Sequence, residues 1–154
     1  MVAWNTLERP STPEYRRNVV WACGLLHYVQ GADLVTIICA KEAGIPIKCY
    51  SPELIVYPVI ELGEEEWVFL SFFMCSADAA AVNALCEKNE RRIKAILSRI
   101  DSLVIGPGAG RNPVMLSTMQ RIIQYAVESK IPLVIDGDGL WAVTQEPQLS
   151  HQSA

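Results

Sequence analysis

The chain has 154 residues, of which 51% are hydrophobic and 19% are charged, a composition typical of one globular domain and not of a disordered chain. Its formal net charge of −4 at pH 7 argues against a nucleic-acid surface that works by neutralising phosphates. Residues 1–10 lack the apolar segment of a signal peptide, and the apolar run 67–75 is too short to cross a bilayer. We therefore expect a cytoplasmic protein, with a mitochondrial form as the alternative, and no contact with membranes.

The five cysteines are scattered and form no C-x-x-C pair; they are Cys23, Cys39, Cys49, Cys75 and Cys86. An odd number at irregular spacing predicts reduced structural thiols in a reducing compartment. Zinc sites need closer ligand spacings than these.

The first third of the chain predicts a helix and a strand after an irregular N-terminus at 1–13. Residues 14–30 follow a helical pattern, which Gly31 would end as the residue after the last turn. The next apolar run, Leu34–Cys39, is nearly continuous. Such a run is typical of a parallel strand that is covered on both faces of its sheet.

Residues 41–48 predict a short helix or turn, and Leu54–Ile60 predict a strand near a sheet edge, because Pro58 cannot donate a ladder hydrogen bond. Residues 61–78 are interpreted as a divergent insertion. Within it, the apolar run 67–75 fits either a buried strand or an exposed, adhesive surface.

Residues 79–100 predict a long helix. Its charged stretch, 87–92, is expected to face solvent. The apolar stripe on the other face comprises Val82, Leu85, Cys86, Ile93, Ile96, Leu97 and Ile100.

A short apolar strand, Leu103–Ile105, then enters a loop with glycines at positions 106, 108 and 110. Glycine permits positive φ angles and lets a phosphate or a ribose approach the main chain. The loop lacks the Gly-Lys-Ser/Thr ending of a P-loop and the G-x-G-x-x-G spacing of a dinucleotide fold. It therefore predicts either an anion site of another kind or a tight strand-to-helix turn without a ligand.

The helix that follows has a clear start, because Asn112 is a good N-cap and Pro113 suits the first helical position. Its N-terminus would favour an anion at the loop, and Arg111 can add a positive charge. The helix is predicted over 113–129, with a core stripe formed by Met115, Met119, Ile122, Ile123 and Ala126.

A second apolar strand, 131–135, ends in Asp136-Gly137-Asp138-Gly139-Leu140, after which another helix or turn begins. Asp136 and Asp138 could bind Mg²⁺ or accept hydrogen bonds from ribose hydroxyls. The alternative is turn chemistry, in which the carboxylates cap the next helix. No Ser-His-Asp, His-x-x-x-His or Cys-His motif is recognisable.

The alternation of strands and helices predicts an α/β fold. Ligands of open α/β sheets bind outside the carboxyl ends of the strands. The glycine loop after 103–105 and the aspartate loop after 131–135 should therefore lie on the same edge and face one crevice.

Three stretches resemble a known family: Gly31–Leu34 with Cys39–Ala40 and Tyr50–Val59, then Val104–Arg111, and finally Ile131–Trp141. In this order they resemble the ATP-dependent NAD(P)H-hydrate dehydratases, which are carbohydrate kinase domain-containing proteins of the ribokinase-like superfamily. The similarity covers most of 31–60 and 100–149.

The resemblance implies a three-layer, mostly parallel sheet with helices on both faces, here incomplete at both ends, as one partial ribokinase-like domain over 1–154. It implies a metabolite-repair lyase that uses ATP or ADP, with Mg²⁺, to dehydrate NADHX and NADPHX. In that family the glycine loop lines the hydrated-cofactor site, which implies substrate contacts at Gly106, Gly108 and Gly110. Asp136 and Asp138 are implied as polar contacts in the same cleft.

The chain also departs from the family. Where the family has Tyr-Thr-Gly-Ala-Pro, this sequence reads Arg16–Val20, and the family's first strand is missing. The chain ends before the family's Gly-x-Gly-Asp motif, which supplies the catalytic base. We therefore expect no catalytic residue within these 154 residues and little activity from the chain alone. The alternatives are a non-catalytic module that binds nucleotides or associates with another subunit, as in a homo-oligomer, and a small-molecule kinase of the same superfamily.

Overall fold

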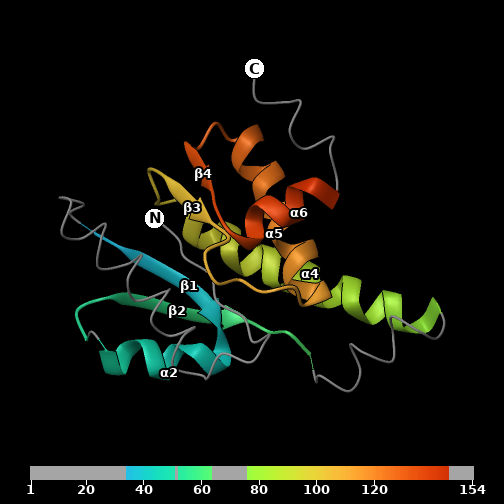
Figure 1. The fold of residues 1–154 in the computed structure, drawn as a ribbon, viewed down its shortest axis with the longest axis horizontal. Coiled ribbons are helices and arrows are strands. Elements are labelled where there is room, and N and C mark those ends of the chain that lie inside the picture. The colour runs from blue at the N-terminus through green and yellow to red at the C-terminus, as the bar shows by residue number, and fades with distance from the viewer. Residues whose placement is uncertain (1–33, 51, 64–75, 146–154) are drawn as a thin grey trace.

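The computed structural model of the chain describes residues 34–50, 52–63 and 76–145 (Figure 1). The predicted N-terminal segment 1–13, the predicted helix 14–30, the apolar run 67–75 and most of the predicted insertion 61–78 lie outside these residues. The described elements are, in order, β1 (Thr36–Ala40), α2 (Lys41–Tyr50), β2 (Ile55–Ile60), α4 (Ser76–Leu97), β3 (Leu103–Ile105), α5 (Pro113–Glu128), β4 (Leu133–Ile135) and α6 (Asp138–Gln145).

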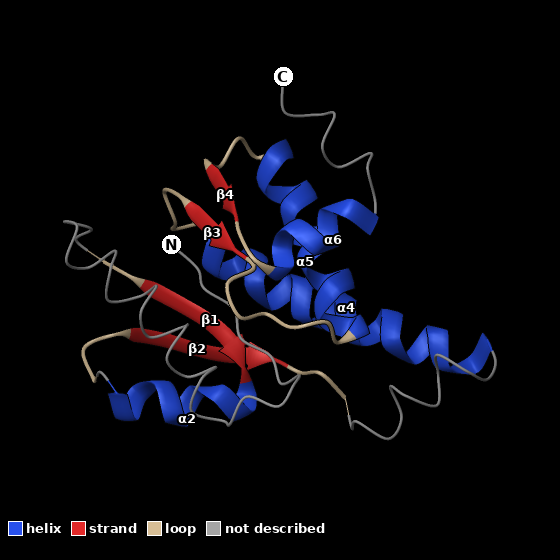
Figure 2. Ribbon diagram, in the orientation of Figure 1, coloured by secondary structure: helices blue, strands red, loops and turns tan. Residues whose placement is uncertain are grey.

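The strands form two parallel pairs, β1 with β2 and β3 with β4. Their arrows point in the same general direction in Figure 2, so the carboxyl ends of both pairs face one side of the molecule. The predicted α/β class with parallel strands is confirmed. Within the described residues, no ladder of hydrogen bonds joins β2 to β3, and the sheet is divided at this point.

β1 is covered on both faces, which explains its continuous apolar sequence. Ile37 and Cys39 belong to one buried cluster together with Ile47 of α2. Ile38, on the opposite face, belongs to a second cluster that includes Ile93 of α4. The layers α2, β1–β2 and α4 therefore stack in this order (Figure 1), as a three-layer arrangement requires.

β2 contains Pro58, which cannot donate a ladder hydrogen bond. Pro58 lies opposite Cys39, and the register shifts between Cys39 and Ala40. Because proline lacks an N–H, a bulge at this position avoids an unpaired ladder position in the strand. α2 extends over ten residues instead of a short turn and contains Pro46.

α4 begins three residues earlier and ends three residues earlier than predicted. The backbone N–H groups of Arg99 and Ile100 donate to carbonyls three residues back, at 3.1 Å each, so the last turn tightens. The prediction that 87–92 faces solvent is wrong for Asn89, whose side chain is fully buried.

α5 matches its prediction closely. Asn112 is the N-cap, and its Oδ1 accepts from the backbone N–H of Val114 at 2.9 Å and of Met115 at 3.4 Å. The predicted core stripe is buried throughout. It packs in one cluster with Leu103 and Ile105 of β3 and with Ile60 of β2, so apolar contacts join the two strand pairs.

Candidate functional site

The carboxyl ends of β3 and β4 lie side by side, as the sequence predicted. Leu103 pairs with Leu133 and Ile105 pairs with Ile135, so both strands end at the same level. The backbone N–H of Asp136 donates to the carbonyl of Ile105 at 3.0 Å. The glycine loop and the aspartate loop therefore start next to each other at the carboxyl end of this strand pair, where ligands of open α/β sheets bind.

Gly106 lies where the two loops touch, and only glycine fits there. Its φ is +111°, and a Cβ atom at this position would lie 1.9 Å from the carbonyl oxygen of Asp136 and 2.4 Å from the nitrogen of Gly139. Gly139 is also tightly enclosed, because its own Cβ would lie 2.8 Å from the carbonyl oxygen of Ile105. The two loops pack backbone against backbone.

The remaining glycines of the glycine loop are half-buried, with φ +64° at Gly108 and +71° at Gly110. The backbone N–H of Gly110 donates to Oδ2 of Asp138 at 2.6 Å. A carboxylate that accepts from a main-chain N–H makes a strong, charge-assisted bond. This bond links the end of the glycine loop to the first residue of α6.

Asp136 and Asp138 play different parts in the structure. Asp138 is partly buried and is held by Gly110, whereas Asp136 is exposed and its Oδ1 accepts only from the neighbouring Gly137 N–H, at 2.8 Å, among the described contacts. The N–H groups of Gly139 and Leu140 donate to backbone carbonyls. Asp136 therefore makes the local turn contacts of the alternative prediction, but no hydrogen bond described in the structure joins either carboxylate to an N–H group inside α6.

Within residues 34–50, 52–63 and 76–145, no group of three or more His, Cys, Asp or Glu side chains gathers around a point where a metal ion could sit. The described residues therefore do not form a resident metal cage. A Mg²⁺ ion beside the glycine loop and the aspartate loop would need oxygen ligands from a bound phosphate.

Arg111 and Trp141 lie together beside Asp138, where the two loops meet, and the sequence patterns assigned no role to Trp141. The Arg111 guanidinium lies 4.4 Å from the centre of the Trp141 ring, and its Nε lies 3.8 Å from Oδ1 of Asp138. Asp138 and Trp141 are three residues apart on α6, and this spacing places them on one helix face. That spacing was the available signal in the sequence.

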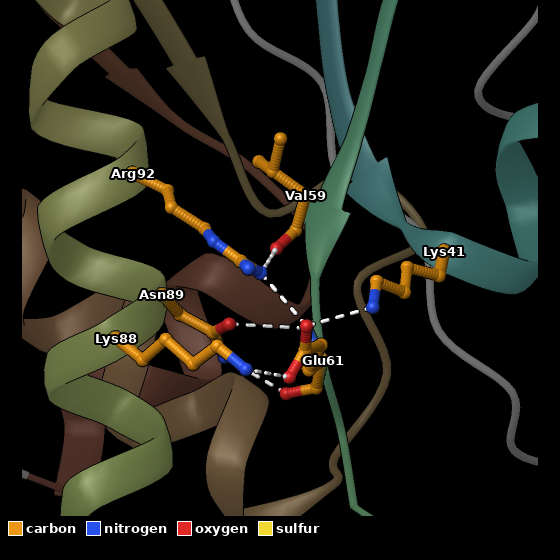
Figure 3. Close-up of polar contacts among 6 residues, drawn as sticks. All are labelled: Lys41, Val59, Glu61, Lys88, Asn89 and Arg92. Atoms are coloured by element: carbon orange, nitrogen blue, oxygen red, sulfur yellow. Dashed lines mark hydrogen bonds and ion pairs between the residues drawn. The ribbon is translucent and has the colours of Figure 1, made fainter.

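A second polar cluster lies at the carboxyl ends of β1 and β2 (Figure 3). The Glu61 carboxylate, after β2, pairs with Lys41 at 2.7 Å, with Lys88 at 2.6 Å and with Arg92 at 2.8 Å. The buried Asn89 side chain accepts from the Glu61 N–H at 3.0 Å and donates to the Glu61 carbonyl at 2.8 Å. This Glu61 cluster attaches the end of β2 and the start of α2 to α4.

The surrounding cations also determine the charge of Glu61. Hydrogen bonds from Lys41, Lys88 and Arg92 hold the pKa of its carboxyl well below the ordinary value of 4.5. A carboxyl whose pKa falls on folding stabilises the folded state above its unfolded pKa, and this contribution is lost as the pH falls through the folded value. Glu61 therefore stabilises the fold at neutral pH and loses this effect only in acid.

Replacing Glu61 by glutamine should lower the free energy of unfolding by about 1–2 kcal/mol at neutral pH, because Lys41 and Lys88 are half exposed and each pair contributes modestly. Urea unfolding at about pH 7 and at about pH 2, which approaches the lowered pKa of Glu61, checks this. The variant should lose less stability than the wild type between the two conditions. Parallel losses in both proteins would contradict the assignment.

The described cysteines are free thiols: Cys39 and Cys86 are buried and Cys49 is exposed. Burial, with a smaller effect from Glu42, raises the pKa of the Cys39 thiol to about 12. Burial also raises the pKa of Cys86. Neither buried thiol is therefore suited to act as a nucleophile.

None of the helices described in the structure is both long enough and apolar enough to cross a membrane.

The family model described as "Carb_kinase: NAD(P)H-hydrate dehydratase" matches residues 22–154. The ATP-dependent (S)-NAD(P)H-hydrate dehydratase of Physcomitrium patens is 41% identical over 126 residues, which cover 77% of this chain and 32% of that protein. The protein of the same name from Saccharomyces cerevisiae is 36% identical over 126 residues, which cover 80% of this chain and 33% of that protein. The one from Rattus norvegicus is 38% identical over 121 residues, which cover 79% of this chain and 28% of that protein.

The chain thus spans about a third of the length of the curated relatives it matches. The family match covers most of the chain, including β1, β2, the glycine loop and the aspartate loop. This chain belongs to the NAD(P)H-hydrate dehydratase family.

Proposed function

We propose that the protein carrying this chain is an ATP-dependent NAD(P)H-hydrate dehydratase that repairs NADHX and NADPHX. In this reaction, the γ-phosphoryl group of ATP passes to the hydroxyl oxygen of the hydrated nicotinamide ring, and ADP leaves. The C–O bond of the resulting phosphate ester then breaks as the neighbouring carbon loses a proton. Phosphate departs, the ring double bond forms again, and NADH or NADPH is restored.

The observation that carries this proposal is the junction of the two loops through Gly110 and Asp138. Gly108 and Gly110 are half-buried and carry no side chain, so the substrate can approach their main chain. Gly106 would serve the site by allowing the loops to pack. Asp138 aligns the loop, and the exposed Asp136 carboxylate would accept hydrogen bonds from substrate hydroxyl groups.

ATP, or ADP in its place, is the proposed phosphoryl donor, and Mg²⁺ would arrive bound to its phosphates, because the described residues gather no metal-ligand cluster of their own. No step of the proposal depends on a metal held by these residues. Phosphoryl transfer would rely on the positions of the two substrates and on hydrogen-bond donors that stabilise the negative charge developing on the phosphate oxygens.

The direct test is conversion of NADPHX to NADPH by the purified protein with ATP, followed by NADPH absorbance. Asp136→Asn is the informative variant, because asparagine keeps the backbone and the Oδ1 acceptor and removes only the charge. We expect its kcat/KM for NADPHX to fall by about tenfold or more, the usual cost of losing a charged hydrogen bond. Asp101→Asn is the matched control, since Asp101 is exposed at the amino end of β3.

Absence of ATP-dependent conversion in the full-length protein that carries this chain would defeat the proposal, whereas little activity is expected from these 154 residues alone. Calorimetry with NADPH, NADHX and ATP then tests the alternative of a non-catalytic nucleotide-binding module, which binding without turnover would support.

We propose the cytoplasm as the compartment, with a mitochondrial form as the alternative. The free thiols of the described cysteines support a reducing environment. Light scattering would test the predicted homo-oligomer.

A further inference from the structure

Arg111 occupies a defined position at the edge of the glycine loop. It follows Gly110 directly, and its side chain is 59% exposed. The guanidinium plane rests on Trp141, whose ring centre lies 4.4 Å away and whose surface is 39% exposed. An arginine stacked on an aromatic ring loses conformational freedom before any ligand arrives.

α6 holds both partners of Arg111 in place. Its Ala142 is buried in the main core, and the Ala142 carbonyl accepts from the Gln120 side chain of α5 at 3.0 Å. Asp138 and Trp141 therefore project from an anchored helix. The contacts that hold α6 in place do not involve Arg111, so Asp138 and Trp141 keep their positions without it.

Asp138 attracts the Arg111 guanidinium by charge but accepts no hydrogen bond from its N–H groups. Oδ2 of Asp138 accepts the Gly110 N–H at 2.6 Å, whereas Oδ1 lies 3.8 Å from Nε of Arg111, beyond hydrogen-bond distance. The two Nη groups have no described hydrogen bond within residues 34–50, 52–63 and 76–145. They form a planar fork that suits two oxygens of one phosphate.

We propose that Arg111 binds a phosphate group of the dinucleotide substrate, and that Trp141 and Asp138 are positioning residues for its guanidinium. The proposal rests on the proposed function. Arg111 adjoins Gly110 at the loop assigned there to the hydrated dinucleotide, and we therefore assign the phosphate to the dinucleotide and not to ATP. Both the diphosphate bridge and the 2′-phosphate of NADPHX offer the required chemistry.

Steady-state kinetics with saturating ATP test this assignment. In Arg111→Gln, the KM should rise about ten- to a hundredfold, the range expected for losing a charge-assisted hydrogen bond, while kcat stays within about twofold. A rise for NADPHX alone identifies the 2′-phosphate, and an equal rise for NADHX identifies the diphosphate. Arg111→Lys should recover only part of the loss, because lysine has no planar fork.

The role of Trp141 in positioning Arg111 is tested by the KM for the dinucleotide. Trp141→Leu should raise the same KM by about two- to fivefold without changing kcat, since a cation stacked on an aromatic ring contributes about 0.5–1 kcal/mol. Trp141→Phe should restore most of the affinity. Arg99→Gln removes the same charge from an exposed position near the amino end of β3 and should leave both constants unchanged.

Unchanged KM values for both dinucleotides in Arg111→Gln would overturn the inference, as would a rise in the KM for ATP alone. Calorimetry with NADPH separates this failure from failure of the proposed function. If the wild type binds NADPH and Arg111→Gln binds it at least tenfold more weakly, Arg111 is supported even without turnover. If the wild type binds no dinucleotide, both proposals fail.

Discussion

Replacing Gly106 by alanine is expected to destabilise the folded chain by about 4 kcal/mol or more, a cost that few single substitutions reach. The new Cβ would lie 1.9 Å from the Asp136 carbonyl oxygen and 2.4 Å from the Gly139 nitrogen. Both atoms belong to backbone, which cannot move aside as a flexible side chain can. The φ of +111° adds strain for any residue with a Cβ.

Gly137→Ala is the matched control. Gly137 also has a positive φ, +53°, but the nearest atom to its added Cβ would be 3.5 Å away, at an ordinary contact distance. Its cost should be about 1–2 kcal/mol, from the left-handed backbone alone. Urea unfolding of the two variants against the wild type measures the difference. Equal costs would show that the two loops do not meet backbone against backbone.

Asn89→Ala is expected to lower the free energy of unfolding by about 2–4 kcal/mol, because it leaves two backbone groups of Glu61 without partners. The Asn89 side chain is fully buried and pairs with the N–H and the carbonyl of Glu61. It thereby satisfies the N–H and the carbonyl of the residue that directly follows β2 and ties this end of the strand to α4.

Asn83→Ala, on the same helix, supplies the control. Asn83 is exposed: its amide donates to Glu87 at 3.0 Å, and its Oδ1 accepts from Arg121 of α5 at the surface. Both substitutions change helix propensity by the same amount, so the difference between them reports the buried contacts. The exposed variant should stay within about 0.5 kcal/mol of the wild type. Similar free energies of unfolding for both variants would contradict the claim that the buried hydrogen bonds of Asn89 stabilise the fold.

The glycine and aspartate loops were predictable because local chemistry determines them. Asn112 and Pro113 specify the start of α5 in any context, and the apolar stripe of α5 specifies its buried face. Two short apolar strands joined by one helix form a parallel pair whose ends coincide. The meeting of the two loops at Gly106 and Asp136 follows from these coinciding strand ends.

Asn89 escaped prediction because nothing in its own segment distinguishes it. It lies in a run of charged residues, 87–92, that has the composition of a solvent-exposed helix face. Its partner, Glu61, is 28 residues away in the sequence. A hydrogen bond between such distant groups depends on how β2 docks against α4, which no local pattern encodes.

The sequence by itself determined the α/β class, the bounds of α5, the pairing of β3 with β4 and the edge on which the two loops meet, because each depends on short-range periodicity or on the conformational limits of glycine, asparagine and proline. The tertiary structure alone decided the division of the described strands into two pairs and the burial of Asn89. It also decided the Glu61 cluster of Figure 3 and the stacking of Arg111 on Trp141. These features join residues from separate elements, and their geometry exists only once the helices have packed against the strands.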